Sequence, residues 1–142
     1  MRGINTSRWL MSGIIAGVIF AIVDFVLNGM VLVQQWAAAM TALGLPQIGG
    51  ATVVVFIIID LVVGLAAMWI YVGIRPRFGA SVTTAVYAGL ATWLLAILVP
   101  NVVILVTGLL PSGLVWTIIV VGIVQFVVGT VVGAYFYQEE AA

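Results

Sequence analysis

Four long runs of apolar residues dominate the chain, and short stretches rich in polar residues, glycine or proline separate them. The runs cover about residues 9–33, 51–72, 82–105 and 112–137. A helix needs about 20 apolar residues to cross a bilayer, and each run reaches that length. The runs are continuous rather than alternating, which favours helices over the strands of a membrane barrel. We therefore predict an all-α polytopic membrane protein, with four transmembrane helices in a single bundle over residues 1–142.

Each predicted helix carries one face of small and polar residues when it is projected at about 100° per residue. In helices 1 and 2 a clear face of bulky apolar residues lies opposite. Lipid cannot satisfy polar groups, so the small and polar faces are expected to turn inward. These faces hold Gly13, Gly17, Asp24 and Asn28 in helix 1, Asp60, Gly64, Ala67 and Tyr71 in helix 2, Ala85, Ala88, Gly89, Thr92 and Ala96 in helix 3, and Gly122, Gln125, Gly129 and Gly133 in helix 4.

The polar residues of these faces lie at similar depths in their spans. We predict a polar cluster near the midplane, formed by Asp24, Asn28, Asp60, Thr92 and Gln125. No Arg or Lys lies within a span to neutralise the two acids. A charge at the bilayer centre costs about 2.5–3.5 kcal/mol on insertion scales, so we expect at least one Asp to be protonated and to donate a hydrogen bond. The cluster is interpreted either as a fastener between helices or as a proton or cation site.

Glycine spacing predicts where helix backbones approach closely. Gly13 and Gly17 are four residues apart, as are Gly129 and Gly133, and this spacing is typical of tight helix contacts in membranes. We expect helix 1 to pack on helix 4 through these motifs, with a contact between two copies of the chain as the alternative. Gly64 and Gly89 are further candidates for packing. Residues 60–64 and 125–129 have similar sequences, which suggests two repeated helical hairpins.

The four arginines set the expected orientation. Arg2 and Arg8 precede the first span, Arg75 and Arg77 join the second to the third, and the other two connectors contain no Lys or Arg. The positive-inside rule then places both termini in the cytoplasm. Binding of lipid headgroups by these arginines is the alternative explanation of their positions.

The sequence also predicts local structure in the connectors and at a few single positions. Residues 74–79 are predicted to form a tight turn because they contain proline and glycine. Residues 35–43 are expected either to extend helix 1 or to lie in the interface. Pro100 is expected to kink helix 3, and the indole N–H of Trp93, in the middle of that span, requires a partner. Glu139 and Glu140 are expected to form a solvated tail.

Composition excludes several classes of function. The chain is 65% hydrophobic and 6% charged, whereas soluble domains are about 25% charged. It contains no Cys and no His, which removes disulfides, thiolate chemistry and the usual metal sites. Net charge is zero, and the chain has no basic patch for nucleic acid. No nucleophile motif or phosphate-binding loop is present, so we do not expect an enzyme.

Three short motifs carry a resemblance: DFVLNG at residues 24–29, QQWAA at 34–38 and IRPRFG at 74–79. With them, the chain resembles small, uncharacterised four-helix integral membrane proteins of bacteria. The resemblance implies a bacterial cytoplasmic membrane and implies no activity. The chain is also similar in size to small multidrug-resistance transporters, which have an acid in helix 1. It departs from them because that acid is Asp24, lies deeper, and is joined by Asp60.

These observations lead to one main hypothesis and two alternatives. The main hypothesis is a non-enzymatic scaffold or accessory subunit, embedded in lipid as a homo-oligomer or within a larger membrane complex. The first alternative is a small proton- or cation-linked transporter or channel that uses the midplane acids. The second is binding of a lipid or of an intramembrane cofactor, whose identity the sequence leaves open.

Overall fold

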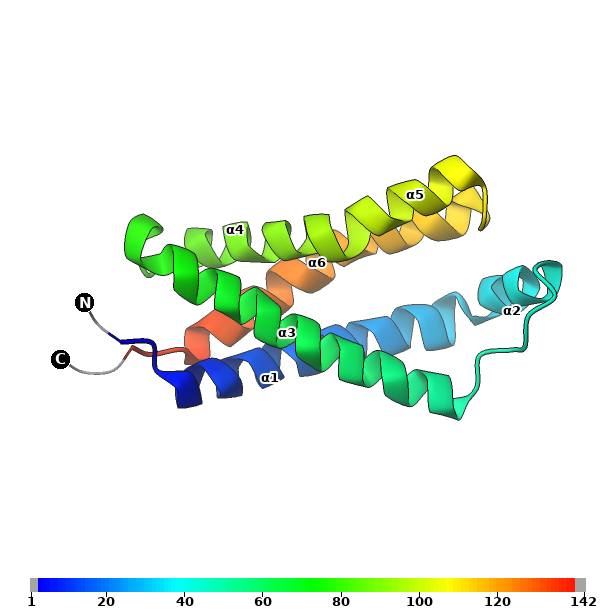
Figure 1. Ribbon diagram of the computed structural model, residues 1–142. Helices are drawn as coiled ribbons and strands as arrows, with labels where there is room; N and C mark the ends of the chain where they lie inside the picture. The colour runs from blue at the N-terminus through cyan, green and yellow to red at the C-terminus, as the bar shows by residue number, and fades with distance from the viewer. Residues whose placement is uncertain (1–2, 140–142) are drawn as a thin grey trace.

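A computed structural model describes residues 3–139, and every regular element in that range is helical (Figure 1). Four helices are long and apolar enough to cross a membrane, which confirms the predicted fold class and shows a multi-pass helical membrane protein. The start of the first span, the end of the last span and the turn at residues 79–81 lie at one end of the molecule, which we call the termini end. The other end, which carries the short helix α2 (Val33–Ala42), is called the α2 end. The spans are Thr6–Val31, Gly50–Phe78, Val82–Thr107 and Ser112–Phe136.

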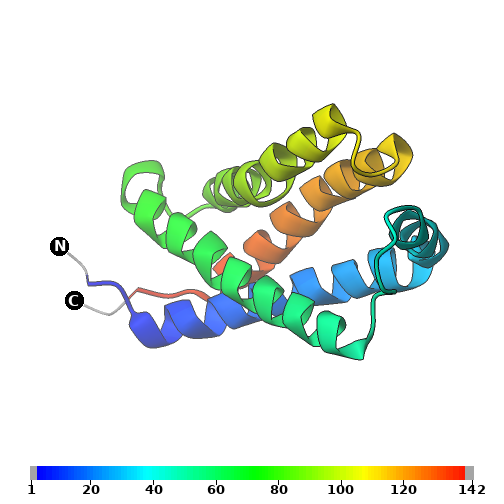
Figure 2. The same cartoon turned by 45° about the vertical axis from the view of Figure 1, so that its right-hand side comes forward.

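The first span consists of α1 (Thr6–Val26) followed by a π-helical segment, η1 (Leu27–Val31). Asn5 caps α1, because its side-chain oxygen accepts the backbone N–H of Arg8 at 3.0 Å. At Leu32 the backbone leaves helical geometry, and the short helix α2 (Val33–Ala42) begins. α2 turns out of the line of α1 (Figure 2), so it is not a straight extension of the first span.

The second span is a single helix, α3 (Gly50–Phe78), which is longer than predicted. The predicted turn at residues 74–79 was wrong in its position, because the helix continues through Pro76. A proline near the helix end removes only one backbone hydrogen bond. The helix stops instead at Gly79, whose φ of 86° is accessible to glycine at little cost. Ser81 then caps α4 (Val82–Trp93) by accepting the backbone N–H of Thr84 at 3.2 Å.

The third span bends between α4 and α5 (Val99–Thr107), as Figure 1 shows. A π-helical segment, η2 (Leu94–Leu98), joins the two helices, and Pro100 follows it directly. Proline lacks an N–H and crowds the carbonyl four residues earlier, and a π-helical turn relieves that crowding. Gly108, at a φ of 66°, ends α5, and α6 (Ser112–Phe136) returns to the termini end.

The four spans form a ring in which each packs mainly on two neighbours, and α3 and α6 also touch across the centre. α1 packs on α3 and α6, and α4 closes the ring by packing on the same two helices. α1 and α3 cross and diverge toward the α2 end (Figures 1 and 2). Most residues of the expected inward faces are buried, among them Gly64, Ala67, Ala88 and Gln125, while bulky residues such as Ile58 are exposed. Asp24, Asn28 and Ala96 are half-buried. Ala16, Ala67, Ala88 and Phe126 belong to one buried cluster. A second cluster, containing Leu27, Leu32, Ala39 and Leu114, joins η1 and α2 to the start of α6.

Glycines mark the tightest crossings. A Cβ atom on Gly64 of α3 would collide with the backbone of Gly13 and Gly17 on α1. A Cβ atom on Gly89 of α4 would lie 2.8 Å from the carbonyl oxygen of Phe126 on α6. Each hairpin therefore has one glycine-mediated backbone contact between its two helices, as two repeated hairpins would have.

The glycine motif of α1 differs from the sequence-based expectation in one respect. Its two glycines face α3 rather than α6, because the α1–α3 crossing uses them. Gly129 and Gly133 of α6 do face α1, where an added Cβ would meet Phe20 and the carbonyl oxygen of Ser12. Glycines thus approach α1 from two neighbours, Gly64 of α3 on one side and Gly129 and Gly133 of α6 on the other.

The crossing predicts opposite effects for two glycines of the same helix. Gly64→Ala is expected to cost about 1–3 kcal/mol of unfolding free energy, because the methyl group overpacks a backbone contact. Gly73→Ala is the matched control, since no atom lies within 4 Å of its added Cβ. That change is expected to be neutral or to stabilise the helix by about 0.5–1 kcal/mol. Unfolding by denaturing detergent would measure both, and equal effects would contradict the proposed role of the crossing.

Candidate functional site

A chain of hydrogen bonds connects three helices on the α2 side of the bundle centre. The indole N–H of Trp36 donates to Asn28 Oδ1 at 2.9 Å. Asn28 Nδ2 donates to Asp24 Oδ1 at 3.4 Å, and Gln125 Nε2 donates to the same oxygen at 3.0 Å. Gln125 Nε2 also lies 3.0 Å from the carbonyl oxygen of Phe20. We call Trp36, Asn28, Asp24 and Gln125 the polar chain.

Local backbone geometry places Asn28 and Trp36 together. Asn28 lies in η1, where the backbone N–H of Leu32 bonds the carbonyl of Leu27 at 2.8 Å in the wider π-helical turn. The break at Leu32 then turns α2 so that Trp36 reaches back to Asn28. π-helical turns within helices are frequent at functional sites. Trp36 was not among the residues predicted to form the polar cluster, although an indole N–H in an apolar region needs an acceptor.

All the hydrogen-bond donors in the polar chain are neutral amide or indole N–H groups. Gln125 is 3% exposed, so its amide has no access to water and depends on these partners. Asp24 and Asn28 are half-buried and complete the chain toward α2. Amide and indole N–H groups neither gain nor lose protons near neutral pH. The arrangement therefore holds α6, α1 and α2 in register.

Asp60 lies apart from the polar chain. Its residue is 7% exposed, and within residues 3–139 its carboxyl group makes no hydrogen bond. The carbonyl oxygen of Asp60 lies at the level of Gly17 in the α1–α3 crossing. Asp24 is about two helical turns further along α1, roughly 10 Å at 1.5 Å per residue. The backbones of the two acids thus lie at two different levels.

Thr92 and Trp93 bond to backbone rather than to the polar chain. Thr92 is buried, and its hydroxyl donates to the carbonyl of Ala88 in its own helix at 2.8 Å. The indole N–H of Trp93 donates to the carbonyl of Ile119 on α6 at 2.9 Å. Gly122 leaves room for this ring, since an added Cβ would lie 3.2 Å from Trp93 Cδ1. Trp93 therefore fastens α4 to α6, which supplies the partner that its N–H requires.

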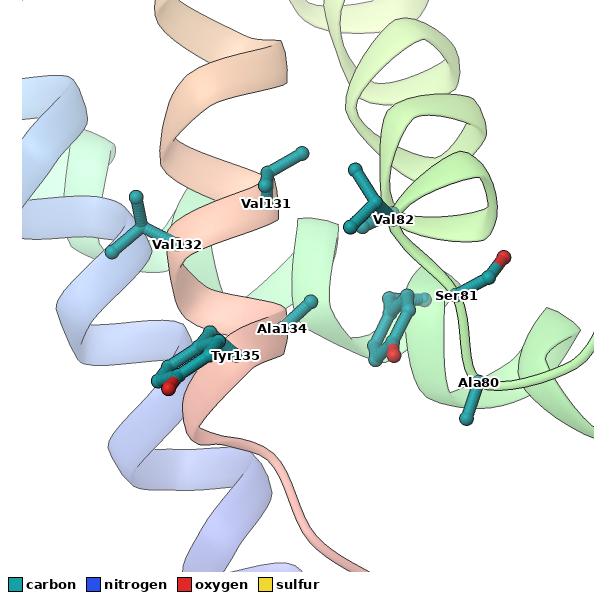
Figure 3. Close-up of a pocket in the computed structure, with 9 residues that line it drawn as sticks. Ala80, Ser81, Val82, Val131, Val132, Ala134 and Tyr135 are labelled. Atoms are coloured by element: carbon teal, nitrogen blue, oxygen red, sulfur yellow. The ribbon is translucent and has the colours of Figure 1, made fainter.

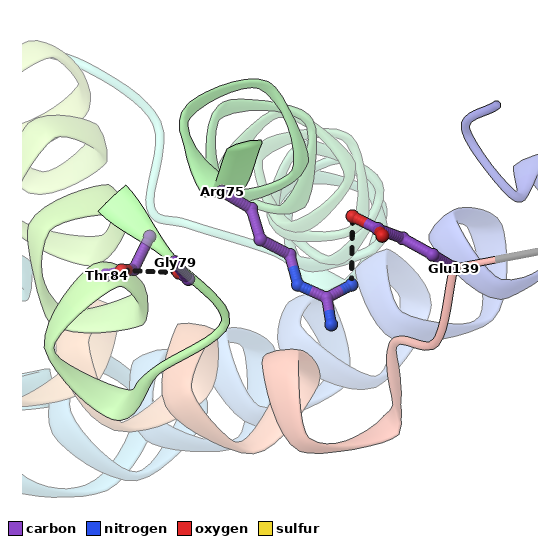
Figure 4. Close-up of polar contacts among 4 residues, drawn as sticks. All are labelled: Arg75, Gly79, Thr84 and Glu139. Carbon is purple, nitrogen blue, oxygen red and sulfur yellow. Dashed lines mark hydrogen bonds and ion pairs between the residues drawn. The ribbon is translucent and has the colours of Figure 1, made fainter. Parts of the chain in front are cut away.

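The arginines that were expected to set the orientation or to bind lipid headgroups have different surroundings in the structure. Arg8 and Arg77 are exposed at the termini end, and Arg2 lies outside the described residues. Arg75 reaches across this end to Glu139, with Nη1 and Oε1 3.4 Å apart (Figure 4). Its guanidinium also lies 5.2 Å from the ring centre of Tyr137, which is itself 4% exposed. Glu139 is therefore held against the bundle rather than solvated, and Glu140 lies outside the described residues.

An apolar groove lies at the termini end, between the start of α4 and the last turns of α6 (Figure 3). Its volume is about 420 Å³. Val82 and Ala85 line one side, Val131 and Ala134 the other, and Tyr71 belongs to the lining. Ligand sites that recognise a cofactor place several polar groups around an apolar pocket. This lining is chiefly aliphatic and lies at the opposite end from the polar chain, so the two are separate features.

Residues 3–139 contain no group of three or more His, Cys, Asp or Glu that could hold a metal ion. Comparison of the chain with protein families, curated proteins and solved structures found no match. The site must therefore be interpreted from its own geometry. That geometry comprises a bonded acid, Asp24, and an unbonded acid, Asp60, on neighbouring helices.

The bond between Gln125 and Asp24 predicts a measurable coupling. Hydrogen bonds between membrane helices average about 0.6 kcal/mol and reach about 1.7 kcal/mol. A double-mutant cycle of Gln125→Leu and Asp24→Leu is expected to give a coupling energy in that range in detergent unfolding. Asp24→Asn should cost less than Asp24→Leu, because the amide oxygen still accepts both bonds. Strict additivity of the two leucine variants would show that the bond contributes nothing.

Proposed function

We propose that this protein is a non-enzymatic membrane scaffold or accessory subunit, which associates through its lipid-facing helices with a second copy or with a larger membrane complex. The proposal rests on the first half of α3, which lies toward the α2 end. None of the residues from Gly50 to Ile59 is buried, so this half of the helix has no full contact with the rest of the chain on any side. A helix that extends alone from its crossing offers a complete apolar surface to another helix.

The rest of the molecule supports a role within the membrane. Short connectors join most of the spans, and the longest one contains the small helix α2. Little of the chain therefore extends outside the apolar spans to recognise a soluble ligand. The polar chain, together with the bond of Trp93 to Ile119, fastens the bundle internally, and the exposed side chains in the middle of the spans are chiefly apolar.

We further propose that the protein lies in a bacterial cytoplasmic membrane with both termini in the cytoplasm. Arg8, Arg75 and Arg77 support this orientation, because all three belong to the termini end. Positive charges concentrate on the cytoplasmic side of membrane proteins. In this orientation the α2 end faces the opposite side.

The association is testable with matched surface variants. In mild detergent the wild-type protein is expected to have a mass above that of one chain, or to retain a membrane partner. Ile58→Trp on α3 should reduce this mass toward that of a single chain, because the larger ring disturbs helix packing. Val103→Trp on α5 is the control, since the two residues have similar exposure, 54% and 59%. A wild-type protein that elutes as a bare monomer would contradict the proposal.

The buried acid Asp60 favours a second candidate function, proton- or cation-linked transport. Acids within a membrane commonly mark ion pathways. In sealed liposomes, Asp60→Asn is then expected to abolish ion-driven flux, whereas Asp24→Asn, which keeps its hydrogen bonds, should retain part of it. Absence of flux for protons, sodium and organic cations with the wild-type protein would exclude this candidate.

A further inference from the structure

The two intramembrane acids differ in the hydrogen-bond donors that surround them. Asp24 accepts two amide N–H groups, whereas Asp60 has no donor within the described residues. Asp24 is the one acid of α1 and could not balance a negative charge on Asp60, and Gln125 is a polar neutral residue in the middle of α6. The nearest arginine on its own helix, Arg75, is about four turns away, roughly 22 Å. Asp60 is therefore buried without a group that could balance a negative charge.

The position of Asp60 along α3 gives it a defined direction of access. It is the first buried residue of the helix when counted from Gly50, and the residues before it are exposed or half-exposed. Beyond it, the buried face continues with Gly64, Ala67 and Met68 into the main apolar cluster. α1 and α3 diverge on the Gly50 side of their crossing (Figure 2). Asp60 thus lies at the boundary between the exposed first part of α3 and its buried second part.

The ligand that fits this position is a proton. Calcium and magnesium require about six or more oxygen ligands, and a single carboxyl group supplies two. The described residues provide no cluster of acids that could complete such a shell. An isolated carboxylate away from water is very costly, and the group becomes neutral when it takes up a proton.

We propose that the carboxyl group of Asp60 is a proton-binding site that opens toward the α2 end and is closed toward the termini end. Binding of the proton is independent of the scaffold role, and only its use in transport rests on the second candidate function. Asp24, whose carboxyl is engaged by Gln125 and Asn28, serves as a structural acceptor. The two acids therefore have different roles despite their similar depths in the sequence.

Dicyclohexylcarbodiimide tests the protonation directly, because it reacts with protonated carboxyl groups in membranes. The carboxyl proton moves to a carbodiimide nitrogen while the oxygen bonds to the central carbon. Transfer of the acyl group from that oxygen to nitrogen then leaves a stable N-acylurea, and no group departs. The intact mass of the wild-type protein is expected to increase by one adduct. The adduct should persist in Asp24→Asn, disappear in Asp60→Asn and return in Asp60→Glu.

Two results would overturn the assignment of the proton to Asp60. One is an adduct that persists in Asp60→Asn and is lost in Asp24→Asn, which would place the proton on the other acid. The other is a wild-type protein without any adduct. The elution profile in detergent verifies that each variant is folded, and the Asp60→Glu variant keeps the test decisive if Asp60→Asn does not fold. An adduct without flux in liposomes would retain the proton site and exclude only transport.

The absence of cysteine from the chain permits a test of the opening. Asp60→Cys and Ala67→Cys each introduce a single thiol on the same face of α3. A charged, water-soluble thiosulfonate added to either side of sealed vesicles should modify Asp60→Cys only from the α2-end side. Ala67→Cys, at a position that is 0% exposed, should stay unmodified. Modification of Asp60→Cys from the termini end would contradict the proposed direction.

Discussion

The close backbone contact of α1 with α3 is the constraint on which the rest of this structure depends. Gly13, Gly17 and Gly64 allow the two helices to approach so closely that a single methyl group does not fit. In lipid, apolar side chains gain little by leaving their solvent for each other, so helix association relies on tight packing and on hydrogen bonds. The crossing supplies the packing, and its position determines where each helix diverges from the other.

That crossing also explains the different surroundings of the two acids. Asp60 lies at the level of Gly17, where the backbones are closest, and within residues 3–139 no side chain donates a hydrogen bond to it. Asp24 lies about two turns further along α1, where the polar side chains of α6 and of η1 approach it. Polar groups in lipid must be satisfied within the protein, and only the second position provides partners. The same crossing leaves the first half of α3, from Gly50 to Ile59, without a buried residue.

The termini end is organised by a different kind of contact. Tyr137 follows α6 and is buried against Tyr71, with their ring centres 6.2 Å apart, and Arg75 lies over it. Glu139 then pairs with Arg75. Within residues 3–139, the Nε of Arg75 and the hydroxyl of Tyr137 are nevertheless buried without a hydrogen-bond partner. This end is thus held by aromatic and charge contacts, while the centre is held by glycine crossings and amide bonds.

The sequence by itself determined the four spans, the inward faces of the helices and the bend beside Pro100, because these follow from hydrophobic length, helical period and proline chemistry. Only the tertiary structure decided that Gly13 and Gly17 face α3, that Trp36 bonds Asn28, and that Asp24 and Asp60 lie at different levels. A helical projection gives the angle of each residue around its own axis. It contains no information on which neighbour occupies that side or how far two helices are shifted along each other. Those relations arise from the crossing and from the π-helical turn of η1, and no local sequence pattern predicts either of them.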